Sequence, residues 1–341
     1  MKHIRLSSII LGLVVFISLL TGINTALVSA QASNANAAQG MQISPPRVEL
    51  NAAKGKTYKI VITVTNVTAS DLVYTTAIAD FNAANETGSP HIFVNSKLPV
   101  TASIRTWVDT IPEFTLKGRK SKVLTMQVAI PDNAEPGGHY GVIKFSGTAP
   151  ELESTGVGLS ASAGVLMFIR VDGAITEKAT LASFYTSATQ TGKQSSFFEN
   201  SPIWFITRIK NEGNIHVKPV GDIEVRDMFG GLVTNFPVNK DKANALPSSI
   251  RRFDEAKLDK SWMIGQYTAN LTLGYGTTGQ AITSTIKFWV IPYKIILAAL
   301  LVLITLIYIL TRLIKVYNRH IIEKAKNENK KKTKKRHKKT S

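Results

Sequence analysis

The chain has 341 residues, a formal net charge of +18 and no cysteine. The lack of cysteine excludes disulfides, thiolate metal sites and cysteine-based catalysis. The positive charge is concentrated at the carboxy-terminal end, where residues 312–341 carry 13 Lys and Arg against two Glu, a net charge of +11. Residues 6–311 hold only +5, so the basic composition does not indicate nucleic-acid binding.

The first 30 residues have the pattern of a secretory signal peptide. Lys2 and Arg5 precede an apolar stretch of 12 residues from Ile9 to Leu20, and small residues around Ala30 offer a cleavage site. An uncleaved anchor is the alternative, and both interpretations place the middle of the chain outside the cytoplasm. Residues 31–40 are small and polar without apolar periodicity, so we predict a flexible spacer.

Residues 41–172 consist of short β-like runs separated by turn residues, and they predict the first of two immunoglobulin-like β-sandwich domains. In the clearest run, Tyr58 to Asn66, every second side chain is apolar. A loop rich in Asn, Gly and Ser is predicted at 82–90. The other predicted strands are 43–50, 72–81, 102–108, 113–116, 123–130, 139–146 and 165–173.

Residues 173–290 have the same texture and predict a second domain of this kind. There is a faint internal repeat, because the segments that begin at Val61 and at Phe205 each resemble a strand that ends in Asn, followed by a turn and another strand. The expected fold class is therefore all-β, with two tandem sandwiches favoured over one large barrel. The strands predicted in the second domain are 203–211, 217–226, 232–238, 267–275 and 280–290.

We predict a single transmembrane helix at 291–311. Residues 295–311 are an uncharged run of 17, which spans about 25 Å as a helix at about 1.5 Å per residue. Trp289 and Tyr293 before or at its start, and Tyr308 near its end, are suited to the two bilayer interfaces. A buried helix of a soluble core is the alternative, but the run is apolar on all sides.

The tail 312–341 is expected to lie in the cytoplasm, since basic residues beside a membrane helix mark its cytoplasmic side. Anionic lipid headgroups attract such residues by roughly 1 kcal/mol per charge. RNA or ribosome contact is the competing interpretation, but no aromatic residues are interleaved with the Lys run to stack on bases. The predicted topology is a single-pass cell-membrane protein with its sandwiches outside and no nucleic-acid partner.

No arrangement of side chains indicates catalysis, a metal or a cofactor. The six His are scattered without metal-ligand spacing. Asp80, Asn82, Asn85 and Glu86 gather oxygen ligands in one loop, which makes calcium binding conceivable. Their spacing departs from that of an EF-hand, and turn formation explains these residues equally well. We predict a protein that is not an enzyme and that has no cofactor or metal.

Several short motifs, taken in order, resemble the WxL-interacting protein family in its amino-terminal peptidoglycan-binding domain. The resemblance covers about residues 41–146. The motifs are SPPRVEL from Ser44, the strand that ends at Asn66, DFNAANETGSP from Asp80, RTWVDTIPEFTLKGRKSK from Arg105, and IPDNAEPGGHYG from Ile130.

This resemblance implies a surface protein of a bacterium with a wall, built from a signal peptide, two β-sandwiches, a transmembrane helix and a basic tail. It implies that the first domain binds peptidoglycan and that the second engages a partner, such as another surface protein or a host. Residues 173–290 carry no motif that aligns with the second domain of the family.

The candidate ligand-binding residues are Trp107, His139 and Tyr140. We choose them on chemical grounds, because aromatic rings stack on sugar faces, and because the turn at 136–138 leads directly into His139 and Tyr140. The alternative is a buried Trp and a core Tyr of a sandwich.

Three functional hypotheses follow. The first is a non-catalytic, membrane-anchored bacterial surface protein that binds peptidoglycan, a surface partner protein or both. The second is a chaperone-like or accessory subunit that pairs its strand edges with a partner chain. The third is a cell-wall enzyme, which the missing catalytic constellation disfavours.

Overall fold

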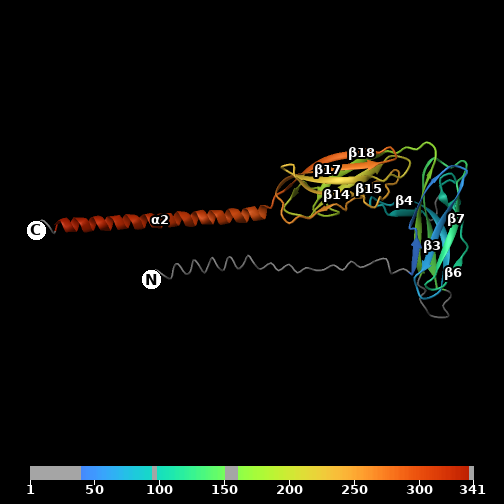
Figure 1. Cartoon of the computed structure of the whole chain (residues 1–341), viewed down its shortest axis with the longest axis horizontal. Helices are drawn as coiled ribbons and strands as arrows, with labels where there is room; N and C mark the ends of the chain where they lie inside the picture. The colour runs from blue at the N-terminus through green and yellow to red at the C-terminus, as the bar shows by residue number, and fades with distance from the viewer. Residues whose placement is uncertain (1–39, 94–97, 150–159, 338–341) are drawn as a thin grey trace. The chain divides into compact units, whose positions relative to one another are not determined.

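The computed structural model in Figure 1 describes residues 40–93, 98–149 and 160–337. The predicted signal peptide, 1–30, and all of the predicted spacer except Gly40 lie outside the described residues. From Met41 to Val290 the described chain forms β-strands and one short 3₁₀ helix, and a single long helix follows. The predicted fold class, two β-sandwiches followed by one apolar helix, is confirmed.

The first sandwich contains two sheets. One has the strand order β1-β3-β7, and the other has the order β2-β9-β8-β4-β5, with β6 also paired to β4. All pairs are antiparallel except β2 with β9. The strands are β1 (Met41–Ser44), β2 (Arg47–Ala52), β3 (Thr57–Asn66), β4 (Leu72–Ala83), β5 (Pro90–Phe93), β6 (Phe114–Leu116), β7 (Ser121–Ala129), β8 (Gly137–Thr148) and β9 (Ser160–Val171).

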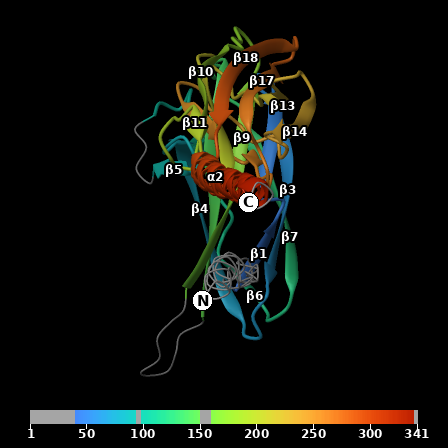
Figure 2. The ribbon, with the colours of Figure 1, turned by 90° about the vertical axis from the view of Figure 1, so that its left-hand side faces the viewer.

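The second sandwich also has two sheets. One has the order β10-β12-β15, with β16 paired to β12, and the other has the order β11-β18-β17-β13-β14. The neighbouring strands β13, β17 and β18 are visible in Figure 2. The strands are β10 (Ala179–Ser187), β11 (Phe197–Phe198), β12 (Ile203–Asn211), β13 (Val220–Asp227), β14 (Leu232–Val238), β15 (Ile250–Phe253), β16 (Lys257–Leu258), β17 (Gly265–Tyr275) and β18 (Gln280–Val290).

Each sandwich has its own apolar core, made from the alternating inward side chains of its strands. In the first core, Trp107 and Met126 are fully buried, and Tyr74 stacks on Phe114 with 5.4 Å between ring centroids. In the second, the ring of Phe288 lies 5.5 Å from that of Tyr267 and 5.8 Å from that of Phe205. Burial of such aromatic side chains is the main favourable term in a chain without disulfides.

The internal repeat seen in the sequence corresponds to a buried Asn at the end of a strand in each sandwich. Asn66, the last residue of β3, has no exposed surface. Its side-chain Nδ2 donates to the carbonyl oxygens of Ser70 and Leu116, at 2.8 and 3.1 Å. Its Oδ1 accepts from the backbone N–H of Thr68 at 2.9 Å.

Asn211 ends β12 and makes the equivalent bonds, of which the two local ones have the same sequence offsets. Its Nδ2 donates to the carbonyl oxygens of Ile215 and Ala245, both at 2.8 Å. Its Oδ1 accepts from the N–H of Gly213 at 2.9 Å. Each Asn thus supplies hydrogen bonds to a turn whose backbone groups would otherwise be buried without partners.

Several sequence-based expectations differ from the structure. The strand expected at 102–108 is wrong, because Ile104–Thr106 form a 3₁₀ helix that Ser103 caps. The strand expected at 43–50 is two strands in different sheets, separated at the double proline, whose nitrogens donate no ladder hydrogen bond. The predicted loop 82–90 contains the end of β4 and the start of β5.

Helix α2 (Tyr293–His337) has 45 residues, which corresponds to about 68 Å at about 1.5 Å per residue. Its stretch from Tyr293 to Lys326 is long and apolar enough to cross a membrane, and its most apolar part is not buried by the rest of the described chain. The helix therefore extends beyond the span predicted at 291–311 into the basic tail.

We expect Asn66→Ala and Asn211→Ala each to lower the free energy of unfolding by about 1–3 kcal/mol, since both leave buried backbone groups unpaired. The measurement is thermal unfolding of the full chain in detergent, followed by circular dichroism. Asn82→Ala is the control, because Asn82 is exposed on β4; its effect should stay within about 0.5 kcal/mol. Equal effects of all three variants would contradict the proposed role of the buried amides.

Candidate functional site

The first candidate site is the junction between the two sandwiches, which has an apolar centre. Phe81, Tyr140 and Phe168 lie on the outer face of the larger sheet of the first sandwich. Leu246 and His216 from the second sandwich pack against them. The ring of Phe168 lies 5.6 Å from that of Phe81 and 5.3 Å from that of His216. These contacts exclude water from the middle of the junction.

Charged pairs surround this centre. The Arg208 guanidinium holds the Glu86 carboxylate with two nitrogens, and its Nε donates to Oε2 at 2.7 Å. This hydrogen bond lowers the pKa of Glu86 below its ordinary value. The carbonyl oxygen of Glu86 also accepts from the N–H of Arg252 at 2.8 Å. Lys218 and Glu49 form a further ion pair across the junction.

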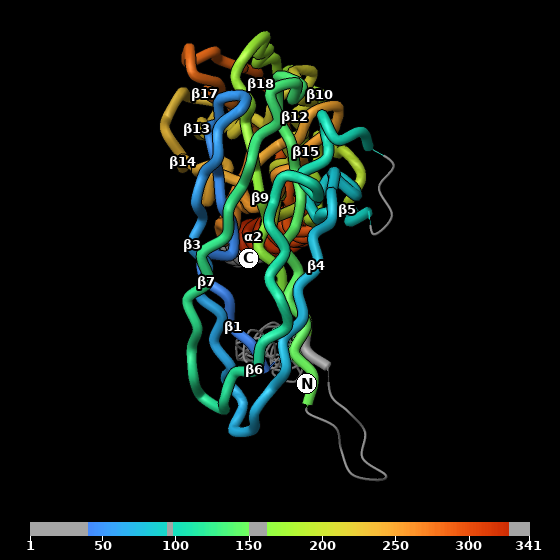
Figure 3. Tube along the Cα trace, turned by 90° about the vertical axis from the view of Figure 1, so that its right-hand side faces the viewer, coloured from blue at the N-terminus to red at the C-terminus, as the bar shows by residue number. Residues whose placement is uncertain are grey.

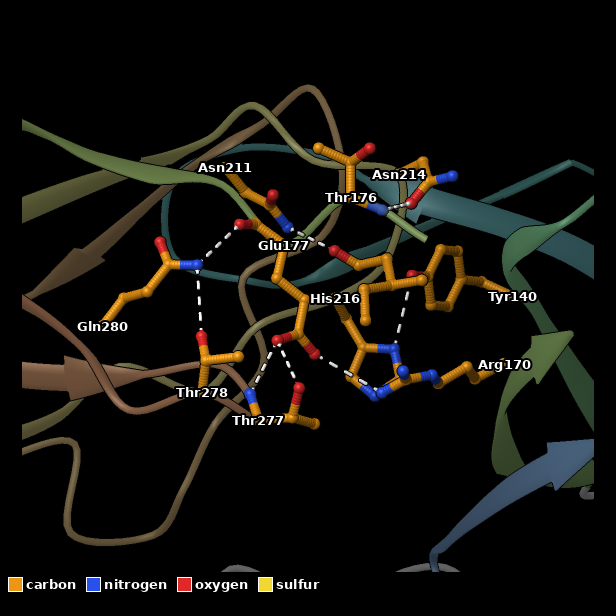
Figure 4. A network of polar contacts seen from close by, with 11 residues as sticks. Tyr140, Arg170, Thr176, Glu177, Asn211, Asn214, His216, Thr277, Thr278 and Gln280 are labelled. Carbon is orange, nitrogen blue, oxygen red and sulfur yellow. Dashed lines mark hydrogen bonds and ion pairs between the residues drawn. The ribbon is translucent and has the colours of Figure 1, made fainter. Parts of the chain in front are cut away.

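The segment that links the sandwiches is fixed by Glu177 (Figure 4). The Glu177 carboxylate accepts from the N–H and Oγ1 of Thr277, at 2.6 and 2.9 Å, in the turn between β17 and β18. It also accepts from Nη1 of Arg170 on β9 at 3.4 Å. One side chain therefore connects the linker to both sandwiches.

Asn214 fixes the same linker from its other side. Its side chain accepts from the N–H of Thr176 and donates to the carbonyl oxygen of Ala174, both at 2.8 Å. Its own carbonyl oxygen accepts from the N–H of Gly138 at 2.8 Å. Gly138 is the second residue of β8, which carries His139 and Tyr140, so the junction and that strand are directly connected.

A cleft of about 440 Å³ opens beside the junction and is lined by charged residues of both signs. Glu49 and Glu177 face Lys218 and Arg170, and each of these four is paired. Burial lowers the pKa of His216 to about 4, so its imidazole is neutral at pH 7. The paired charges leave the cleft nearly neutral, which fits a joint that holds two domains better than a catalytic site.

Of the three residues predicted to bind a ligand, His139 and Tyr140 lie on opposite faces of β8, and Trp107, which lies in no strand, packs against His139. Trp107 is 1% exposed, and its Nε1 donates to the carbonyl oxygen of Val100 at 2.7 Å. His139 is also buried, with its ring centroid 4.5 Å from that of Trp107. Tyr140 faces the junction instead, since neighbouring residues of a strand point to opposite faces. Its Oη lies 3.3 Å from Nδ1 of His216.

The burial of Trp107 fits the alternative of a buried Trp, whereas Tyr140 faces the junction and is not in the sandwich core. The rings of Trp107 and His139 are not on the surface, where they could stack on a sugar. Their ligand-binding role stays a prediction. In the loop considered for calcium, Asp80 is buried and accepts from Oγ of Ser103 at 2.7 Å, while Glu86 is paired with Arg208 as described. Within the described residues, no group of His, Asp and Glu has the arrangement of a metal site.

Sequence reasoning missed the junction. The partners in its ion pairs are 122 and 169 positions apart, for Glu86 with Arg208 and Glu49 with Lys218. No local pattern connects residues so distant. The one available signal was the repeat that contains Asn211, because the turn it supports carries both Asn214 and His216.

The second candidate site is the outer side of β7, which we call the β7 edge and define as Ser121–Thr125. β7 pairs with β3 on one side, as Figure 3 shows. On its other side, the described residues pair only with its last part, through a bridge between Val108 and Val128. The N–H and C=O groups that point outward along the β7 edge therefore have no strand partner in the described chain.

Two hydrogen bonds at the end of β7 show which of its residues direct their backbone groups outward. Gln127 accepts from the N–H of Asp109 at 3.0 Å, and Ala129 donates to the carbonyl oxygen of Trp107 at 2.7 Å, both away from β3. Because alternate residues direct their backbone groups to the same side, Val123 and Thr125 also direct theirs away from β3.

The sheet face beside the β7 edge contains no acidic side chain within β3 and β7. Val61 and Val123 are 54% and 64% exposed on it. The register pairs Val61 with Thr125 and Thr63 with Val123, so apolar and hydroxyl side chains alternate across the two strands. Such a surface suits contact with another β-strand.

No protein-family model matches the sequence, and no curated protein matches it. Solved structures with a similar fold include the YadV chaperone, at 11% identity and a TM-score of 0.37, covering 73% of this chain and 100% of that one. The E. coli chaperone DraB has 14% identity and a TM-score of 0.34, covering 74% and 95%. A chain of the Salmonella enterica SafA pilin–SafB chaperone complex has 10% identity and a TM-score of 0.34, covering 74% and 97%. At these values the likeness assigns no activity to this chain.

We expect acid to weaken the junction through His216. Its pKa of about 4 in the folded chain lies below its ordinary 6.5. Between these values the unfolded chain binds a proton that the folded chain does not, so stability falls as pH drops from 6.5 to 4 and is unaffected by this group above 6.5. The loss should be on the order of 2 kcal/mol, allowing for partial exposure.

The measurement is the melting temperature of the full chain between pH 7.5 and 4.5, a range set by those values. His216→Gln should flatten the dependence, whereas His91→Gln should not, because His91 is exposed on β5. Glu49 interacts electrostatically with His216, so its contribution changes together with that of His216, whereas the other acidic residues are common to all three proteins. Parallel curves for His216→Gln and the unmodified chain would contradict the assignment.

Proposed function

We propose that this protein is a non-catalytic surface protein, anchored by α2, that binds a partner protein by strand addition at the β7 edge. The observation that carries the proposal is the row of outward backbone groups at Val123 and Thr125 without a strand partner in the described chain. A partner strand laid along this edge would extend the three-stranded sheet by one strand.

The side chains beside the edge support such binding. Main-chain hydrogen bonds give affinity to any extended segment, and side-chain contacts select among segments. Val123 and its diagonal neighbour Val61 on β3 offer apolar contacts to the partner. A partner strand with apolar residues at every second position fits this surface.

The proposed location follows from the two ends of the chain. The predicted signal peptide directs the sandwiches outside, and α2 anchors them in the cell membrane. The basic residues after Thr311 stay in the cytoplasm by the positive-inside rule, where they attract anionic lipid headgroups. This orientation exposes the β7 edge to other proteins of the cell surface.

Thr125→Pro should reduce partner binding at least tenfold. Proline removes the outward N–H at this position, while the even-numbered residues keep their hydrogen bonds to β3. Binding is measured by photo-crosslinking in the cells that naturally produce the protein. A benzophenone side chain is placed at Val123 in the full chain, and the crosslinked partner is identified by mass spectrometry. Thr125→Val, which keeps the N–H and the branched shape, should crosslink like the unmodified protein.

A melting temperature of Thr125→Pro within a few degrees of the unmodified chain shows that the fold is retained. Undiminished crosslinking in that folded variant would overturn strand addition at this edge. An equal loss of crosslinking in Thr125→Val would also overturn strand addition, because contact would then depend on the Thr hydroxyl and not on the backbone.

Peptidoglycan binding, which the family resemblance implies, is a separate proposal. Cosedimentation of the full chain in detergent with purified sacculi tests it. Sedimentation that persists in Thr125→Pro would assign the wall and the partner strand to different surfaces. If the unmodified chain does not sediment with sacculi, the wall-binding proposal is wrong.

A further inference from the structure

Exposed apolar side chains gather at one end of the second sandwich, in two loops. Phe229, at the tip of the turn between β13 and β14, is 87% exposed, and Met228 beside it is also exposed. In the segment before β17, Trp262 is 60% exposed and Ile264 is exposed. We call these two loops the apolar rim, defined by Met228, Phe229, Trp262 and Ile264.

The strand register places the apolar rim at the end of the sandwich from which α2 begins. Gly265, the first residue of β17, pairs with Val290, the last residue of β18. Asp227, the last residue of β13, pairs with Tyr267. A Cβ on Gly265 would meet the methyl group of Met228 at 2.1 Å, so the turn of β13 and β14 lies directly against this end.

Only two residues separate the sandwich from the membrane helix, since β18 ends at Val290 and α2 begins at Tyr293. They span at most about 10 Å. The connection is further fixed by the N–H of Ile291, which donates to the carbonyl oxygen of Phe198 at 2.8 Å, and by an ion pair of 2.8 Å between Lys294 and Glu199. The end of the sandwich therefore stays close to the point where α2 enters the bilayer.

The turn that carries Phe229 is held in one conformation. Oδ1 of Asp227 accepts from the N–H groups of Phe229 and Gly231, at 2.9 and 2.8 Å. The carbonyl oxygen of Gly230 accepts from Arg226 at 2.8 Å, and Gly230 has φ of 84°. This conformation suits glycine and keeps the Phe229 ring directed away from its own domain. The exposure of the ring is thus built into the turn.

We propose that the apolar rim inserts into the interface of the same bilayer that α2 crosses, with Phe229 and Trp262 as its anchors. The bilayer is the occupant because the chain enters it within a few residues of the rim, and because aromatic side chains favour the headgroup region. Trp289 and Tyr293, exposed at the same end, continue the aromatic surface into α2. The second sandwich would then rest on the membrane and would not swing freely on the two-residue connection.

This inference rests on the membrane anchoring in the proposed function, and the experiment separates the two. The chain has no cysteine, so single cysteines can be labelled with the fluorophore NBD at Phe229→Cys, at Leu303→Cys within α2, and at Thr278→Cys. Thr278 is the matched control, because it is an exposed turn residue at the opposite end of β17 and β18. The full chain is reconstituted in phosphatidylcholine–phosphatidylglycerol vesicles, with or without lipids that carry a shallow or a deep spin-label quencher.

We expect the label at Phe229→Cys to be quenched at least twofold by the shallow lipid, and the label at Thr278→Cys to be unaffected. Quenching at Leu303→Cys by the deep lipid shows that α2 is inserted. If Leu303→Cys is quenched and Phe229→Cys is not, the rim is not in the bilayer and this inference is wrong.

Two further outcomes would also decide the matter. A label at Phe229→Cys that is shielded from aqueous iodide but not quenched by lipid would show that a protein covers the rim, which overturns the proposal. Absence of quenching at Leu303→Cys would show that α2 is not inserted, which would overturn the proposed anchoring and this inference with it. As a test without labels, Trp262→Ser should lower the quenching of tryptophan fluorescence by shallow spin-labelled lipid, whereas Trp107→Phe should not, because Trp107 is buried in the core of the first sandwich.

Discussion

The fold depends on a simple requirement, that backbone groups buried where a strand ends must find hydrogen-bond partners. Asn211 meets it in the second sandwich, and Asn66 meets it in the first. The effect of Asn211 reaches beyond its own turn. The turn that it supports presents Asn214 to the linker and His216 to the aromatic rings of the first sandwich. One buried amide thereby helps to define how the two domains are joined in a chain that has no disulfide to join them.

The junction combines an apolar centre with ion pairs at its edge, and the two parts contribute differently. The rings around Phe168 supply most of the favourable free energy, since partly exposed ion pairs contribute little. The ion pairs select one arrangement, because Glu86 and Glu49 accept Arg208 and Lys218 in only one relative position of the domains. In this interpretation the cleft charges are structural, and binding is left to the strand edge and the apolar rim.

Much of the fold could be predicted from the sequence, and the reasons are local. β12, β14 and β18 begin and end at the predicted residues, because their apolar alternation and turn residues are clear. The segment 102–108 was mispredicted, since its conformation depends on Asp80, which accepts hydrogen bonds from Ser103 and Ile104 far along the chain. β10 was missed because its small and hydroxyl residues show no clear alternation.

The site was harder to predict than the fold, because it depends on contacts between residues that are far apart in the sequence. The choice of His139 and Tyr140 treated neighbours in a strand as one site, although the strand divides them between the core and the junction. The β7 edge could not be recognised at all, since a strand reveals that it lies at an edge only when its neighbours are known. The resemblance to a wall-binding family concerns the sequence of the first domain and remains to be connected with a surface.

In the proposed function, in which the protein is anchored by α2 and holds a partner, β18 has a mechanical consequence. It is paired with β17 along its whole length from Gln280 to Val290, and its last two residues are also paired with β11. Tension that enters from α2 pulls this strand along its own axis. The interstrand hydrogen bonds lie across that axis, so they are loaded together in shear and do not open one after another. The strand that joins the second sandwich to α2 is therefore arranged to transmit force without unravelling.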